Sequence, residues 1–213
     1  MRVWLPDRPG ALGAVASRIG AVRGDVVGIE ILERGAGRAI DELAVQLPDA
    51  SLVSLLVAEI AQVDGVDVED VRPAHGVGDP RLDALETAAL LVAARTPAEV
   101  IDQIVGHAAR DFDSDWCVVL DPAAPSICAS SGEAPSGQWL SAFLAGSRSA
   151  SSGGEAGPDD IAWADLATTG LALVLGRKDR PFRSRERRQL EALVGIAGQR
   201  WAELTSSGIA LAR

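Results

Sequence analysis

The chain has 213 residues, of which 47% are hydrophobic and 23% charged, so it is long enough to bury a core and too apolar to be disordered. Its 30 acidic residues outnumber its 20 basic residues, which gives a net charge of −10. Because this charge repels nucleic acids and anionic lipids, we expect neither nucleic acid nor a membrane as a partner. The longest apolar run, Ala88 to Ala94, is too short to span a bilayer, and we expect a cytoplasmic protein.

The first 73 residues predict the order strand, helix, strand, strand, helix, strand. A short strand over Arg2 to Leu5 stops at Pro6, and apolar residues then recur at helical spacing until Gly24. Two alternating runs predict the next strands, and their expected inward-facing residues are Val27, Ile29 and Ile31, then Leu43, Val45 and Leu47. Asp49 or Ser51 is expected to begin the second helix, and valines between 66 and 71 supply the last strand. This order predicts a ferredoxin-like fold with both helices on one face of the sheet.

A linker is expected from Ala74 to Arg81, because this segment contains two glycines and a proline and has no hydrophobic period. The chain is therefore expected to hold two domains, 1–73 and 82–205. In the second domain, one helix is expected over Leu82 to Ala94. A second is expected from Thr96 to Phe112, because Thr96 and Glu99 have the spacing of a capping box. The remaining expected elements are strands at 116–120, 126–129, 161–166 and 171–175, a short helix at 139–144, a mobile loop at 147–160, and a last helix from Ser184. Both domains are thus predicted to be α+β, the second with an antiparallel sheet.

The sequence Asp-Arg-Pro-Gly-Ala-Leu at positions 7–12 stands where the first strand turns into the first helix. Pro9 and Gly10 make a tight turn there, and the N–H groups of the first helical turn favour a carboxylate or another anion. In the context of the β-α-β-β-α-β order, this loop resembles that of the ACT domain family, which comprises small amino-acid-sensing modules. The resemblance covers residues 1–73. It implies a homodimer formed through the edge strand that starts near Val26, with an amino acid bound between the loop of one copy and that strand of the other.

Carried over position by position, this resemblance implies a ligand site with residues from both copies. Its members are Asp7, Gly10, Ala11, Leu12, Asp25 and Val26. Two positions depart from the pattern of the family. Asp25 stands where many amino-acid-binding members have asparagine, and an ionised carboxylate accepts hydrogen bonds without donating any. Leu5 fills a position where some members place a polar ligand.

The second domain resembles the GAF sensor family over about residues 82–204. The resemblance rests on the strand at 170–177, on Pro181-Phe182, and on the helix that contains Leu190 and Leu193. It implies either a small-molecule pocket under a lid or a dimerisation module, and it transfers no pocket residues to this chain. A domain that serves only for packing is an equal alternative.

No catalytic, metal or cofactor residues are predicted. Two histidines and two cysteines do not assemble a nucleophile with its base, nor a metal site, and no nucleotide-binding loop occurs. Cys117 and Cys128 are expected to be buried reduced thiols, although they flank a turn and could also face each other across a hairpin. Seven basic residues between Arg177 and Arg188 either form a site for phosphate or an acidic partner or, as we favour, lie in a solvated loop and helical turn.

The sequence therefore predicts a regulatory protein without enzymatic activity. An ACT-like module would bind a small amino acid at a dimer interface, and a GAF-like module would relay the signal. The alternative is a dimerisation and docking protein that has lost its ligand and interacts with a metabolic enzyme or another protein partner. Asp25 and Leu5 favour this alternative.

Overall fold

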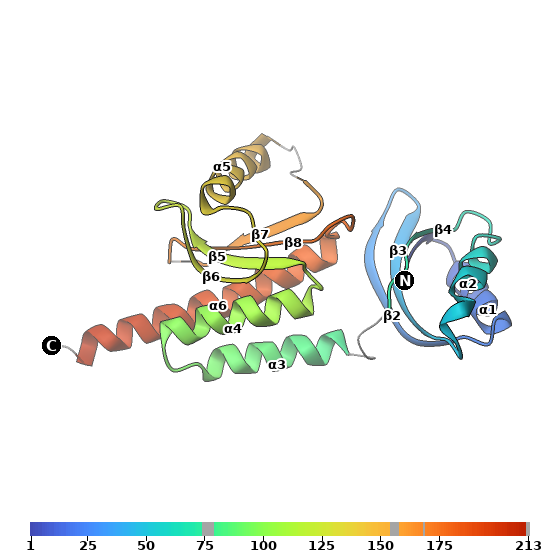
Figure 1. Ribbon diagram of the computed structural model, residues 1–213, viewed down its shortest axis with the longest axis horizontal. Helices are drawn as coiled ribbons and strands as arrows, with labels where there is room; N and C mark the ends of the chain where they lie inside the picture. The colour runs from blue at the N-terminus through green and yellow to red at the C-terminus, as the bar shows by residue number, and fades with distance from the viewer. Residues whose placement is uncertain (74–78, 154–157, 168, 212–213) are drawn as a thin grey trace. The chain divides into compact units, whose positions relative to one another are not determined.

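The computed structural model describes residues 1–73, 79–153, 158–167 and 169–211. The chain divides into two compact units, Met1–Asp79 and Pro80–Arg213 (Figure 1). Each unit combines helices with one four-stranded antiparallel sheet, so the predicted α+β class is confirmed. Most of the expected linker, residues 74–78, lies outside the described residues. Its last two residues already belong to a helix, which begins at Pro80 because proline suits the first turn.

The first unit has the order β-α-β-β-α-β. Its elements are β1 (Arg2–Pro6), α1 (Ala11–Ala21), β2 (Asp25–Gly35), β3 (Arg38–Gln46), the short 3₁₀ helix η1 (Ala50–Leu52), α2 (Val53–Ile60) and β4 (Asp67–Asp70). The strands lie in the order β2-β3-β1-β4, with every neighbouring pair antiparallel. Strand β2 is therefore an edge strand. Asp49, one of the two expected caps, accepts a hydrogen bond from the N–H of Ser51 at 2.7 Å.

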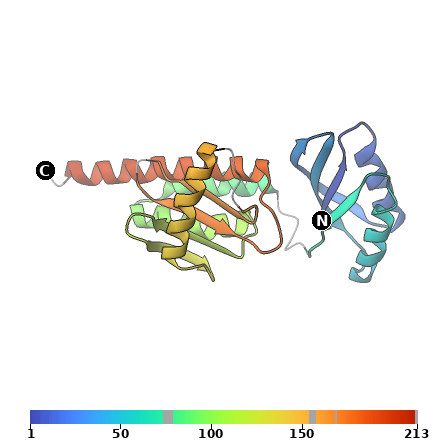
Figure 2. The same cartoon turned by 90° about the horizontal axis from the view of Figure 1, so that it is seen from above.

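One hydrophobic cluster joins the sheet of the first unit to both of its helices. The cluster contains Val3 and Leu5 of β1, Val15 and Ile19 of α1, Leu43 of β3, and Leu56 and Ile60 of α2. Both helices thus cover the same face of the sheet, as Figure 1 and Figure 2 show. The face is selected by the alternation of side chains along each strand, which places odd-numbered residues of β1 and β3 toward the helices.

The expected inward face of β2 is wrong at Val27, and Ile29 lacks the burial that we expected. The pairing with β3 shifts register between Val26 and Gly28, so Val27 lies in an irregularity and Val26 packs against the core instead. Ile29 is 52% exposed. Ile29 pairs with Leu43 and so lies on the helix-facing side of the sheet, but β2 is the edge strand, where a side chain has a neighbouring strand on one side.

The second unit begins and ends with helices. Its elements are α3 (Pro80–Ala93), α4 (Pro97–Asp111), β5 (Trp116–Asp121), β6 (Ser126–Gly132), α5 (Gly137–Gly153), β7 (Ile161–Asp165), β8 (Ala172–Gly176) and α6 (Ser184–Leu211). The strand order is β6-β5-β8-β7. At the start of α4, the hydroxyl of Thr96 accepts a hydrogen bond from the N–H of Glu99, and the carboxylate of Glu99 accepts one from the N–H of Arg95. The predicted helix start is confirmed.

Helices cover both faces of this second sheet. Helices α4 and α6 pack on one face, where Cys117, Val119 and Leu173 join their core, and α3 packs against α4 and α6 (Figure 1). Helix α5 packs on the other face, where Leu140 and Leu144 meet Val118 and Val174. The central strands β5 and β8 are therefore buried on both sides, which explains their continuous apolar sequences.

Helix α5 corrects two expectations. The short helix expected at 139–144 extends to Gly153, so the loop expected at 147–160 is helical over its first half, while residues 154–157 lie outside the described residues. Serine and glycine are weak helix formers, but this segment continues a helix that packs on the sheet through Leu140 and Leu144. Arg148 also forms an ion pair with Asp165 of β7 and lies 5.7 Å from the ring centre of Trp163.

The two cysteines do not face each other. Cys117 is buried and pairs in register with Ser131, whereas Cys128 is exposed on the edge strand β6. The hairpin disulfide is therefore excluded, and the expectation of two buried thiols holds for Cys117 alone. Burial raises the pKa of the Cys117 thiol to about 12, so it stays protonated at neutral pH.

The basic segment 177–188 is less solvated than we expected. Arg177 is 3% exposed, and its guanidinium donates to the carbonyl oxygens of Phe112, Arg180 and Pro181 and to the carboxylate of Glu186. Glu186 also accepts from the N–H of Arg183 at 2.8 Å, which ties the start of α6 to the same network. Arg180 is buried too and pairs with Asp113 at 2.6 Å. Two of the seven basic side chains, Arg177 and Arg180, thus form buried contacts that stabilise the second unit.

This network predicts a large stability difference between two glutamates of α6. Glu186→Ala leaves the buried guanidinium of Arg177 without its carboxylate, so we expect a loss of about 3 kcal/mol in unfolding free energy. The matched change Glu191→Ala, at an exposed position of α6, should cost less than about 0.5 kcal/mol. Urea unfolding measures both, and equal losses would contradict a structural role for Arg177.

Candidate functional site

The loop from β1 to α1 leaves the start of α1 without a side-chain cap. Gly10 is the N-cap residue and has a φ of 89°, a left-handed conformation that favours glycine. No side chain among the described residues forms a capping hydrogen bond there. A Cβ atom at Gly10 would meet nothing within 4 Å, so the space beside the cap is open. The N–H of Ala11 donates to the carbonyl oxygen of Arg8 at 3.3 Å, and the N–H groups of Leu12 and Gly13 are thus available to an acceptor from outside the helix.

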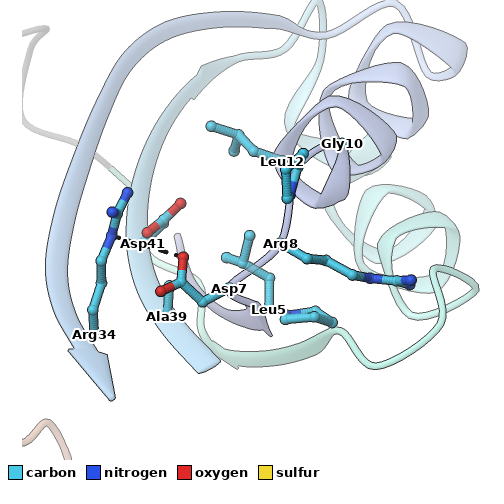
Figure 3. A pocket seen from close by; sticks show the side chains of 10 residues that line it. Leu5, Asp7, Arg8, Gly10, Leu12, Arg34, Ala39 and Asp41 are labelled. Atoms are coloured by element: carbon cyan, nitrogen blue, oxygen red, sulfur yellow. Dashed lines mark ion pairs between the residues drawn. The ribbon is translucent and has the colours of Figure 1, made fainter. Parts of the chain in front are cut away.

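A partly open cavity of about 370 Å³ adjoins this loop. Residues 5–10 and Leu12 form one side, and Arg34, Ala39 and Asp41 of the β2-β3 hairpin form the other. Figure 3 shows Asp7, Arg34 and Asp41 close together, while Arg8 extends away from them. The hydrogen bond from the N–H of Asp7 to the carbonyl oxygen of Gly37, at 2.9 Å, fixes the loop to the hairpin. The cavity therefore lies within one chain, between the loop and the hairpin.

Asp41 is the polar residue of this cavity that is most removed from water. It is 3% exposed, and its Oδ1 atom has no hydrogen-bond partner among the described residues. Burial raises the pKa of its carboxyl group above the ordinary value, Arg34 opposes the rise, and Asp7 adds to it. Asp7 and Arg34 form a long ion pair, with 4.0 Å between Oδ1 and Nε. With all three groups ionised, the cluster of Asp7, Arg34 and Asp41 carries one excess negative charge, while the side chain of Arg8, which also lines the cavity, extends away from the cluster.

This arrangement suits a ligand that carries both a cation and an anion. A cationic group beside Asp41 and Asp7 would offset the excess negative charge. A carboxylate of the same ligand would accept hydrogen bonds from the first turn of α1, where the helix dipole favours negative charge. The cavity thus offers recognition for both ends of a zwitterion. Among the described residues, no group of three or more histidine, cysteine, aspartate or glutamate side chains is placed to hold a metal ion.

The structure brings together some of the predicted site residues. Asp7, Gly10 and Leu12 line the cavity, and Ala11 is buried at the start of α1. Asp25 and Val26 lie at the opposite end of β2, paired with Gln46 and Val45, and do not line it. The predicted site takes these two residues from the second copy of a dimer, so their distance from the cavity within one chain does not contradict it.

Arg34 and Asp41 also line the cavity, although neither was among the predicted site residues. The signal for Asp41 is present in the sequence, because the helix-facing alternation of Leu43 and Val45 continues backwards to positions 41 and 39. An aspartate on the apolar face of a strand indicates either a buried partner or a site. Arg34 has no comparable signal, since its place opposite Ala39 depends on the irregular register of β2.

A search against models of known protein families finds none that matches this chain, and no curated protein matches it either. The helices that the structure describes include none with the length and apolarity needed to cross a membrane.

The raised pKa of Asp41 predicts a pH-dependent stability difference. Because the folded state binds the proton of Asp41 more tightly than the unfolded state does, wild-type stability falls as the pH rises from the unfolded pKa, near 3.8, through the raised folded pKa. Asp41→Asn carries no charge, so we expect it to be more stable than wild type at pH 7 and to lose this advantage as the pH approaches 3.8. Urea unfolding at several pH values measures the difference. Asp64→Asn, at an exposed position that does not line the cavity, is the control, and an advantage for Asp41→Asn that does not change with pH would contradict the assignment.

Proposed function

We propose that the first unit is an ACT-type module that binds a small amino acid in the cavity beside α1. The observation that carries this proposal is one cavity that joins a buried carboxylate, whose Oδ1 atom has no hydrogen-bond partner among the described residues, to an uncapped helix start. The ammonium group of the ligand would lie beside Asp41 and Asp7, and its carboxylate at the first turn of α1. The protein is proposed to act as a regulatory protein rather than as an enzyme.

The edge position of β2 supports the dimer that this proposal requires. Strand β2 spans eleven residues and is paired on one side, to β3. Its exposed Ile29 stands on a strand whose other edge is open to pairing, and such edges invite a second strand. Side-by-side pairing of β2 with β2 of a second copy would join the two sheets and bring Asp25 of each copy toward its partner.

The second unit is proposed to relay the signal in the manner of a GAF-like domain. Its sheet carries α5 on one face and α4 and α6 on the other. An amino acid that binds more tightly to one arrangement of the dimer would shift the population toward that arrangement. The second unit would relay the signal if its own conformation or contacts differ between the two arrangements. In the alternative, both units serve only to dimerise and to dock a protein partner, and no amino acid binds.

A screen of the twenty amino acids by thermal unfolding tests the ligand. One or a few should raise the melting temperature, because a ligand that binds the folded state adds about 2.7 kcal/mol of stability at a hundredfold excess over Kd. An alkylamine and an alkyl carboxylate of matching size should each shift it less, since each satisfies one end of the cavity. No shift with any amino acid would favour the docking alternative.

Two asparagine substitutions locate the binding site. Asp41→Asn should lower the affinity for the bound amino acid by about tenfold, because the ammonium group of the ligand loses a buried counter-charge. Asp25→Asn should change affinity only if the ligand also contacts β2 of the second copy. Isothermal titration gives both values. Unchanged affinity in both variants would place the ligand outside this cavity.

A matched pair of edge-strand variants tests the dimer. Ile29→Lys on β2 should shift the protein toward smaller species at micromolar concentration, because a lysine on the pairing edge opposes strand addition. Ile127→Lys, on the edge strand β6 of the second unit and with 40% exposure, is the control and should leave the mass unchanged. Sedimentation velocity reads out the mass. A wild-type protein that stays monomeric at high concentration would exclude an interface at β2.

A further inference from the structure

Helix α3 exposes an unusual amount of apolar surface. The described residues include eight large apolar side chains that are exposed, and α3 supplies four of them in fourteen residues. These are Leu82 at 52%, Leu85 at 68%, Leu90 at 41% and Val92 at 58%. A surface helix normally turns polar residues to water, and an apolar patch of this kind marks an interaction surface.

The opposite face of α3 is fixed to its own unit. Leu91 is fully buried in the core between the helices. The hydroxyl of Thr87, also fully buried, donates a hydrogen bond to the carboxylate of Asp111 in α4 at 2.6 Å. The orientation of α3 is therefore set by α4 and α6, and its apolar outer face is presented as a rigid surface.

The exposed residues follow the spacing of a coiled coil. Leu82, Leu85, Ala89 and Val92 are separated by three, four and three positions, which is the a-d-a-d pattern of two heptads. A surface with this pattern is complementary to a second copy of itself. Two heptads are too short to form an isolated coiled coil, but α3 is already held as a helix by the unit, so pairing need not supply the free energy of helix formation.

Charged residues beside these four apolar positions favour a second copy of α3 as the partner, in the parallel direction. In this heptad frame Arg81 occupies a g position and Glu86 the following e position, both exposed. A parallel second copy brings Arg81 of each helix next to Glu86 of the other, which gives two symmetric ion pairs. An antiparallel copy with the same apolar layers would instead bring e positions together and place Glu86 beside Glu86 of the second copy, a like-charge contact.

We propose that α3 pairs in parallel with α3 of a second copy of this chain, through a stripe formed by Leu82, Leu85, Ala89 and Val92. This interface is separate from the amino-acid cavity and from strand β2, so it stands whether or not those proposals do. Position 85 lies on the two-fold axis of the pair, with the two side chains in contact, whereas position 90 lies on the flank of the helix.

Cysteine cross-linking of the full chain tests this pairing. In a Cys128→Ser background, which removes the exposed native thiol, Leu85→Cys should form a disulfide-linked dimer about tenfold faster than Leu90→Cys under mild oxidation, because the paired helices hold the two thiols together. Position 90 is the matched control, an exposed leucine on the same helix. Equal rates at the two positions, or no dimer at either, would overturn the proposal.

Charge reversal tests the direction. In the Leu85→Cys protein, Arg81→Glu should slow cross-linking about fivefold, because two exposed ion pairs become like-charge contacts. Adding Glu86→Arg should restore the rate. Circular dichroism confirms that each variant is folded. A double reversal that stays as slow as Arg81→Glu would overturn the parallel arrangement.

Discussion

Transfer of a carboxylate out of water costs free energy unless a cation or a hydrogen-bond donor accompanies it, and the first unit bears that cost at Asp41. The residues on either side of it along the helix-facing side of β3, Ala39 and Leu43, are apolar and buried. Arg34 compensates the charge in part, while Asp7 opposes it. The loop, the uncapped start of α1 and the hairpin are therefore arranged around a group whose charge the described residues do not fully satisfy. A ligand that supplies the missing cation would remove the imbalance.

Local signals in the sequence predicted most of the fold. Alternation identified β3, helical spacing identified α1, and the pair Thr96 and Glu99 marked the start of α4 to the residue. Prediction failed where tertiary contacts override composition. The Ser/Gly-rich end of α5 is helical because the helix is anchored on the sheet, and Ile29 is exposed because its strand lies at an edge. Neither fact is encoded within a window of ten residues.

The residues of the candidate site also divide into those that local sequence predicts and those that tertiary contacts bring to the cavity. Asp7, Gly10 and Leu12 are consecutive or nearly so, and a turn between a strand and a helix is readable from proline and glycine. Arg34 and Asp41 reach the cavity through strand pairing, which depends on the register of β2 and β3. The buried network around Arg177 was missed for a similar reason, since its partner Phe112 lies far away in the sequence. Charge counted along the chain treats such an arginine as a surface cation, whereas the fold uses it as an internal hydrogen-bond donor.

The carboxylate of Asp41 also has an evolutionary consequence. A single base change converts an aspartate codon to a valine codon, and valine would extend the apolar row between Ala39 and Leu43 and relieve the buried charge. Chance mutation thus offers an easy route from a charged pocket to a sealed and more stable core. In a lineage where the cavity had no use, nothing would oppose that route. Under the proposed function, the residue at position 41 in related genes would separate descendants that kept a ligand from those that kept the scaffold alone.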